Sequence, residues 1–149
     1  FLNLSRKDVK RTRLVLRRLI YQQYVERVVI GGKEVIQITE NGRKRALTYR
    51  LEQLTIPQPK KWDGKWRIVI FDIPNKKKYA RELFRKKLQE LNFYQLQKSV
   101  FLYPYPCREQ IEFLREAYEL RPFILYIEAN TVEDKIRLRD YLQTFDITA

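Results

Sequence analysis

The sequence predicts an α+β protein in two parts. In the first part a helix-like run, two strand-like runs and a further helix-like run follow one another, and in the second part strands and helices alternate. The segment 54–65 between them has the prolines and the Asp-Gly pair of a linker, because proline holds the backbone extended and Asp-Gly marks a turn. We place the boundary near Pro59. The predicted domains are residues 1–58 and 59–149.

The first part begins with an amphipathic helix that follows Ser5, a residue type that caps helices, and ends near Gln22. Apolar side chains recur on one helix face: Val9, Leu16, Leu19 and Ile20. The opposite face and its flank are basic: Lys7, Lys10, Arg11, Arg17 and Arg18. A charged face is often only a solvated surface, but here Asp8 is the one acid before Glu26, which favours contact with nucleic acid.

A β-hairpin and a short helix follow. Residues 24–30 and 33–39 are half apolar and flank Gly31-Gly32, which predicts a primed turn between two strands. Thr39 is a candidate cap for a helix over residues 43–50. This order, together with the run ITENGRKRAL, resembles the back half of winged helix-turn-helix repressors. The first part is therefore predicted to be a partial winged helix whose front helices are missing.

The second part predicts a βαββαβ order, which indicates a ferredoxin-like fold. The run WRIVIF has the near-continuous apolar character of a buried central strand, and Pro74 ends it soon after. The remaining elements are two amphipathic helices, three further strands and a final helix. They are expected at residues 79–91 and 107–120 for the helices, within 93–105 and at 123–129 for the strands, and at 133–144 for the last helix.

Composition narrows the function classes. The 149 residues carry a net charge of +13, of which residues 1–61 contribute +10, so a polyanion is the expected partner. The chain has no histidine and a single cysteine, Cys107, which excludes zinc sites of the Cys/His type and histidine-based catalytic triads within one chain. A lone cysteine and the lack of a long apolar segment predict a cytoplasmic protein without membrane contact.

A family resemblance adds to these observations. The run from WRIVIFDIP through QKSVFLYPYPC resembles the middle domain of the PaaX family of transcriptional repressors, over about residues 62–130. That domain is itself similar to the small CRISPR-associated endonuclease. The shared features are Phe71-Asp72-Ile73 after a strand, Arg81 in the next helix, and the run Gln97–Phe101. The resemblance implies a winged helix joined to a ferredoxin-like domain that forms a homodimer.

Two candidate sites follow in the second part. The resemblance implies that Asp72, at the end of the first strand, could hold Mg²⁺ with its twofold mate and activate water for phosphodiester cleavage, a role that suits an oxygen ligand. The other reading is a scaffold aspartate that hydrogen-bonds the following loop. Near it lies a basic cluster at a helix start, which is either a phosphate site or a solvated surface. The cluster comprises Lys76, Lys77, Lys78, Arg81 and Arg85.

The preferred interpretation is a homodimeric, DNA-binding transcriptional regulator that needs no cofactor and is not an enzyme. Double-stranded DNA would contact the basic helix, the wing with Lys33, and the cluster Lys76, Lys77, Lys78 and Arg81. The alternative is a Mg²⁺-dependent endonuclease or spacer-integration subunit of the CRISPR type, with Asp72 as catalytic residue and metal ligand. A third possibility is a dimer whose charge promotes only nonspecific association with nucleic acid.

Overall fold

The chain forms two compact units, Phe1–Gln53 and Leu54–Ala149. The computed structural model describes residues 6–147, and the side chains of residues 8–134 and 137–147. The second unit thus begins a few residues before Pro59, because the segment ahead of that proline already packs with it: the side chain of Ile56 is buried. The predicted cap Ser5 lies outside the described residues.

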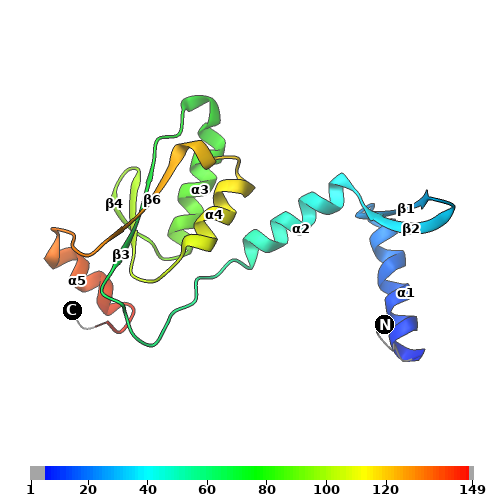
Figure 1. Ribbon diagram of the computed structural model, residues 1–149, viewed down its shortest axis with the longest axis horizontal. Helices are drawn as coiled ribbons and strands as arrows, with labels where there is room; N and C mark the ends of the chain where they lie inside the picture. Colours follow the sequence, from blue (N-terminus) through cyan, green and yellow to red (C-terminus); the bar gives the residue numbers. More distant parts are fainter. Residues whose placement is uncertain (1–5, 148–149) are drawn as a thin grey trace. The chain divides into compact units, whose positions relative to one another are not determined.

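The first unit is a helix, a hairpin and a second helix (Figure 1). Helix α1 (Arg6–Tyr21) leads into strands β1 (Val25–Ile30) and β2 (Lys33–Ile38), and α2 (Glu40–Glu52) ends the unit. The strands pair antiparallel from Val25↔Ile38 to Ile30↔Lys33. Gly31 and Gly32 form the two-residue turn with φ of 58° and 77°, left-handed values that glycine adopts without strain.

Helix α2 is longer than predicted, and its start is fixed by close packing. Thr39 caps it as expected: its hydroxyl accepts a hydrogen bond from the Gly42 amide at 3.0 Å. The same hydroxyl donates to the Gln23 carbonyl at 2.6 Å, so the cap also holds the turn after α1. Gly42 is buried, and a Cβ there would lie 1.9 Å from the Tyr24 carbonyl oxygen. Glycine is therefore required where α2 meets the hairpin.

The second unit is a four-stranded antiparallel sheet with three helices, which confirms the predicted ferredoxin-like βαββαβ fold (Figure 1). The sheet order is β4-β5-β3-β6, so the first strand of the unit lies in the interior of the sheet. The elements are β3 (Trp66–Phe71), α3 (Lys78–Glu90), β4 (Tyr94–Gln97), β5 (Val100–Tyr103), α4 (Arg108–Ala117), β6 (Ile124–Ala129) and α5 (Lys135–Gln143).

The two faces of the sheet are covered differently. Because side chains alternate along a strand, Val69 and Phe71 of β3 face one way and Trp66 and Ile68 the other. Phe71 packs edge-on against Phe84 of α3, with ring centroids 5.4 Å apart, in the core beneath α3 and α4. Figure 1 shows these two helices side by side. On the opposite face, α5 covers Trp66 and Leu102 with its own leucines, Leu138 and Leu142.

Among the described side chains of this unit, one that carries a charge is buried, at the start of β3. The Arg67 side chain is 3% exposed, and its guanidinium donates to both carboxylate oxygens of Asp63 and to the carbonyls of Lys65 and Pro104. These bonds fasten the end of the segment before β3 to the strand that it enters. The nearly continuous apolar pattern of residues 66–73 therefore did not indicate that Arg67 is buried and paired with Asp63.

Candidate nucleic-acid interface and candidate metal site

Helix α1 presents a basic surface without compensating acids. Its sixteen residues include seven Lys and Arg and one acid, Asp8. At about 100° per residue, Arg11 and Arg18 lie within about 20° of each other, and the remaining basic residues extend this arc along one side. The described members are all exposed: Lys10, Arg11, Arg13, Arg17 and Arg18. The side chain of Lys7 lies outside the described residues.

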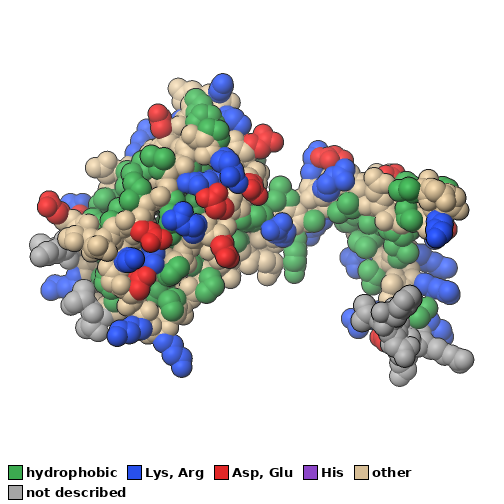
Figure 2. Space-filling view, in the orientation of Figure 1, with side chains coloured by type: hydrophobic (Ala, Val, Ile, Leu, Met, Phe, Trp, Pro, Cys, Tyr) green, Lys and Arg blue, Asp and Glu red, His purple; other side chains and the backbone are tan. Residues whose placement is uncertain are grey.

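These five charges are available to a ligand. No ion pair of the α1 basic side chains is present in the part of the chain that the structure describes, whereas Arg27, Arg43 and Lys44 of the same unit pair with glutamates. Figure 2 shows the blue Lys and Arg side chains along this helix. Sequence reasoning overlooked Arg13, although it is exposed and one helical turn before Arg17. Arg13 lies near the apolar edge of the helix, so the helical pattern does not place it on the predicted basic face.

The hairpin forms an exposed wing beside this helix. Lys33 begins β2 directly after the glycine turn, and its side chain is exposed. At the same tip Val29 is 73% exposed. Arg27 and Glu34 pair across the strands at 3.4 Å, so Lys33 is the basic residue of the tip that has no ion pair among the described residues. The wing thus presents one available cation.

The residues of the predicted basic cluster at the start of α3 differ in whether they already have partners. Arg81 is bonded to the preceding loop: it donates to the Ile73 carbonyl at 3.0 Å and to the Asn75 side chain at 3.2 Å. Lys77 donates to the Glu119 carbonyl at 3.2 Å. Lys76 and Lys78 are exposed and have no ion pair in the described part of the chain. A phosphate would therefore meet two available lysines here rather than a cluster of cations.

Asp72 lies directly after β3, with an exposed side chain. Its amide donates to the Phe123 carbonyl at 2.9 Å, so its backbone joins β3 to the start of β6. The loop after Asp72 is held by Arg81, and no hydrogen bond of the Asp72 carboxylate is found among the described residues. Within the same residues, no group of three or more Asp, Glu, His and Cys is placed to hold a metal ion. One carboxylate alone supplies few of the six or more oxygens that a hard cation takes, so a metal here would need ligands from another source.

Four further residues of the second unit have structural roles. Cys107 precedes α4 and is 1% exposed; burial raises the pKa of its thiol to about 12, which makes it a poor nucleophile. Ser99 lies in the turn between β4 and β5, and its carbonyl accepts a hydrogen bond from the Phe71 amide at 3.1 Å. Phe101 and Tyr103 are buried beneath the helices and so cannot stack on bases.

These features define a class of protein: an α+β chain in which a basic helix–hairpin–helix unit precedes a ferredoxin-like domain. Residues 59–141 match the family described as PaaX protein central Cas2-like domain. The chain therefore belongs to the PaaX family, as the resemblance of its central strand and following helix predicts. No curated protein matches the chain. Among the described helices, none has both the length and the apolar character needed to cross a bilayer.

Proposed function

We propose that this chain is a DNA-binding transcriptional regulator. Its first unit contacts double-stranded DNA, and its ferredoxin-like domain pairs two copies of the chain. The observation that carries this proposal is the exposed basic surface of α1, whose described charges have no ion pairs. Because DNA is the proposed partner, we propose that the chain acts in the cytoplasm.

The helix suits the major groove. An α-helix with its side chains is about 10–12 Å wide, and the major groove is about 12 Å wide. Arg11 and Arg18 lie on one face, two turns apart, so one can reach a guanine edge while the other contacts phosphate. Lys10, Arg13 and Arg17 flank this face and meet one sugar–phosphate backbone. The wing tip with Lys33 reaches a neighbouring backbone.

The dimer would form through the open part of the sheet. Beyond the area that α5 covers, apolar side chains of three adjacent strands share the outer face, because paired residues in an antiparallel sheet project to the same side. Leu125 is 63% exposed and Ile127 is 41% exposed, and they pair with the half-buried Ile70 and Ile68. We name Ile70, Val100, Leu125 and Ile127 the outer-face patch. Packing two such patches would remove them from water and arrange two α1 helices about a twofold axis.

A charge-neutralising pair of variants tests the DNA contact. The double variant Arg11→Gln/Arg18→Gln should bind duplex DNA more weakly, by about 1–3 kcal/mol if one of them reads a base, and its log–log salt slope should fall by about 2 if both meet phosphate. The matched control is Lys86→Gln/Arg137→Gln, which removes the same charge from exposed sites of the second unit. Equal losses in both double variants would show that total charge alone drives the association.

A second candidate function rests on Asp72. Its carboxylate is exposed at a strand end and has no hydrogen bond among the described residues, so it is accessible to a cation. With a second copy across a twofold axis, two such carboxylates could share one Mg²⁺ and activate water for phosphodiester cleavage. Incubation of duplex and single-stranded DNA with Mg²⁺ or Mn²⁺ tests this candidate. Cleavage by the native chain that is lost in Asp72→Asn supports it, and equal results for the two proteins eliminate it.

A further inference from the structure

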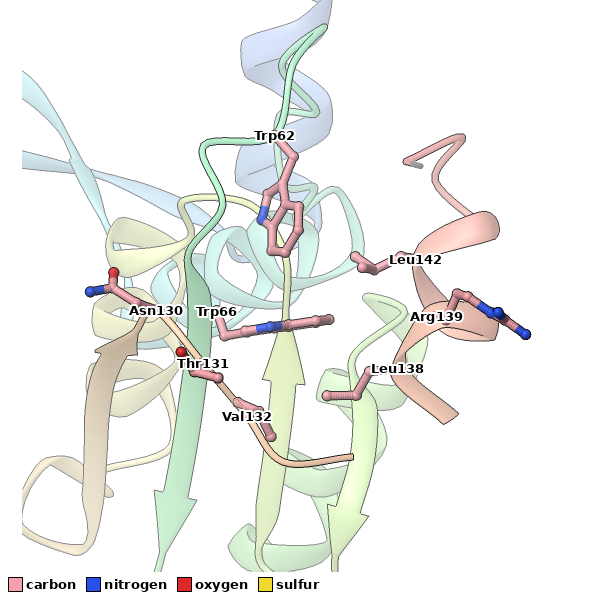
Figure 3. Close-up of a pocket in the computed structure, with 8 residues that line it drawn as sticks. All are labelled: Trp62, Trp66, Asn130, Thr131, Val132, Leu138, Arg139 and Leu142. Carbon is pink, nitrogen blue, oxygen red and sulfur yellow. The ribbon is translucent and has the colours of Figure 1, made fainter. Parts of the chain in front are cut away.

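The second unit contains a pocket between α5 and the start of the sheet, and its described lining residues include neither Asp72 nor a basic residue of α1. Its volume is about 360 Å³. Figure 3 shows the indole of Trp66 across the pocket, Trp62 above it, and Leu138 and Leu142 reaching in from α5. The described residues that line it are Trp62, Trp66, Asn130, Thr131, Val132, Leu138, Arg139 and Leu142.

The chemistry of the walls selects an apolar and uncharged ligand. The indole N–H of Trp62 already donates to the Lys65 carbonyl at 3.0 Å, so this ring turns its hydrocarbon surface to the pocket. Among the described lining residues, the one that carries a charge is Arg139, which is exposed and whose guanidinium points away from the indoles in Figure 3. Polar atoms of Asn130 and Thr131 lie at one side only. A charged ligand would lose its hydration here without gaining a partner inside.

The aromatic arrangement further favours a flat ring. Trp62 and Trp66 meet edge to face, with ring centroids 5.3 Å apart and planes at 66°. The ring of Tyr141 stacks on Trp66 at 6.4 Å and holds the indole in place. A planar ring that enters between these walls can lie against one indole and present its edge to the other, as aromatic rings prefer. The volume lies near the lower end of the range for small-molecule sites, about 300–1,000 Å³.

We propose that this pocket binds a small, uncharged molecule that contains a flat one- or two-ring system. Trp62 belongs to the segment that precedes β3, whereas Leu138 and Leu142 belong to α5. A bound ring therefore joins this segment to α5, and the two become harder to separate from the sheet. The proposal does not depend on DNA binding and stands or falls by itself.

The test uses the whole chain and a matched pair of probes, 6-fluoroquinoline and the anion 6-fluoroquinoline-4-carboxylate. Fluorine NMR should show broadening of the neutral probe in the presence of the protein and much less broadening of the anion. Val132→Trp fills the pocket from a half-buried loop position and should abolish the broadening. The control Val29→Trp makes the same change at the exposed wing tip and should leave the broadening unchanged.

A second readout needs no variant. The chain has two tryptophans, and both line the pocket, so both indole N–H signals in a ¹H–¹⁵N spectrum should shift with the neutral probe. The proposal is overturned if the neutral probe causes no broadening, if the anion binds as well or better, if folded Val132→Trp binds normally, or if the probe binds while the indole signals stay in place.

Discussion

At the scale of single residues, the Asp63–Arg67 ion pair is expected to stabilise the fold of the second unit. The guanidinium is buried, and the carboxylate that it binds is partly exposed, with side-chain exposures of 3% and 44%. Without Asp63, Arg67 would keep its two carbonyl partners but would remain a buried charge without a counter-ion. The pair therefore matters more than a surface salt bridge of the same length.

Asp63→Asn should lower the free energy of unfolding by about 1–3 kcal/mol, the usual cost of leaving a buried donor poorly satisfied. Thermal or denaturant unfolding followed by circular dichroism measures the loss. The control is Asp134→Asn, because Asp134 meets an exposed arginine at 3.8 Å and should contribute little. Equal effects of the two substitutions would contradict the structural role assigned to Arg67.

The same pair predicts a pH dependence. The hydrogen bond from Arg67 holds the pKa of the Asp63 carboxyl below its usual value of 3.8. A carboxyl whose pKa is lower in the folded state contributes stability that is complete above the unfolded pKa and is lost as the pH falls through the folded pKa. The stability difference between the native chain and Asp63→Asn should thus be constant from pH 5 to 8 and should shrink below about pH 4. A difference that persists undiminished in acid would contradict this assignment.

Gly42 provides a residue-scale test in the first unit. In Gly42→Ala the new Cβ would meet the Tyr24 carbonyl oxygen at 1.9 Å, so α2 must shift away from the hairpin. We expect a loss of about 1–3 kcal/mol or more, as for other overpacked sites, with weaker signals from the first unit in NMR. Asn41→Ala is the matched neighbour, since Asn41 is exposed and makes only a 3.4 Å hydrogen bond. Similar spectra for Gly42→Ala and the native chain would refute the close approach.

At the scale of elements, the ends of α2 show what the sequence could and could not predict. Thr39 was identifiable as a cap from its residue type. The sequence nevertheless predicts the helix only over residues 43–50. Gly42 is instead inside the helix, where the approach of a distant backbone requires it. The start of α2 is therefore decided by contacts between segments that are distant in the sequence, and a local sequence pattern carries no information on such contacts.

The two units differ in how well their elements are packed. Gly42 is the one buried residue among the described residues of the first unit, and nine of the twelve exposed large apolar side chains belong to that unit. Between α1, the hairpin and α2, the described residues form an apolar groove that includes Val15, Leu19 and Tyr49. The second unit, in contrast, has a continuous core beneath α3 and α4 and a second one under α5.

This difference predicts unequal protection from hydrogen exchange. Elements with few buried apolar contacts open at low free energy. Amides of α1 and of the hairpin should therefore exchange faster than those of β3 and β5, measured by mass spectrometry on the whole chain in the absence of DNA. Added duplex DNA should slow exchange in α1 more than in α4. Uniform protection of both units in the free chain would contradict the packing difference.

At the scale of the whole molecule, sequence patterns could predict the class of fold but not the surfaces that it exposes. The alternating elements and the apolar strand WRIVIF indicated a ferredoxin-like domain, and the family match confirms it. The outer-face patch could not be predicted, because strand pairing brings Leu125 of β6 beside Ile70 of β3. The pocket at Trp62 and Trp66 likewise depends on where α5 packs.

The outer-face patch predicts the state of association. Leu125→Lys/Ile127→Lys places two charges on the patch and should shift the chain from dimer to monomer in sedimentation at micromolar concentration. Tyr79→Lys is the control, because Tyr79 is 79% exposed and lies on α3, away from the patch. A native chain that sediments as a monomer, or a double variant that stays dimeric, would contradict pairing through this face.

The most direct test of the central claim is selection of duplexes from a random-sequence library by the native chain, at physiological salt and with excess nonspecific competitor. A dimeric regulator should enrich an inverted repeat whose half-sites lie about one helical turn apart. Arg11→Gln/Arg18→Gln, carried through the same selection, should lose this enrichment. Recovery of sequences without a common repeat would contradict a sequence-specific regulator and would leave only nonspecific association driven by charge.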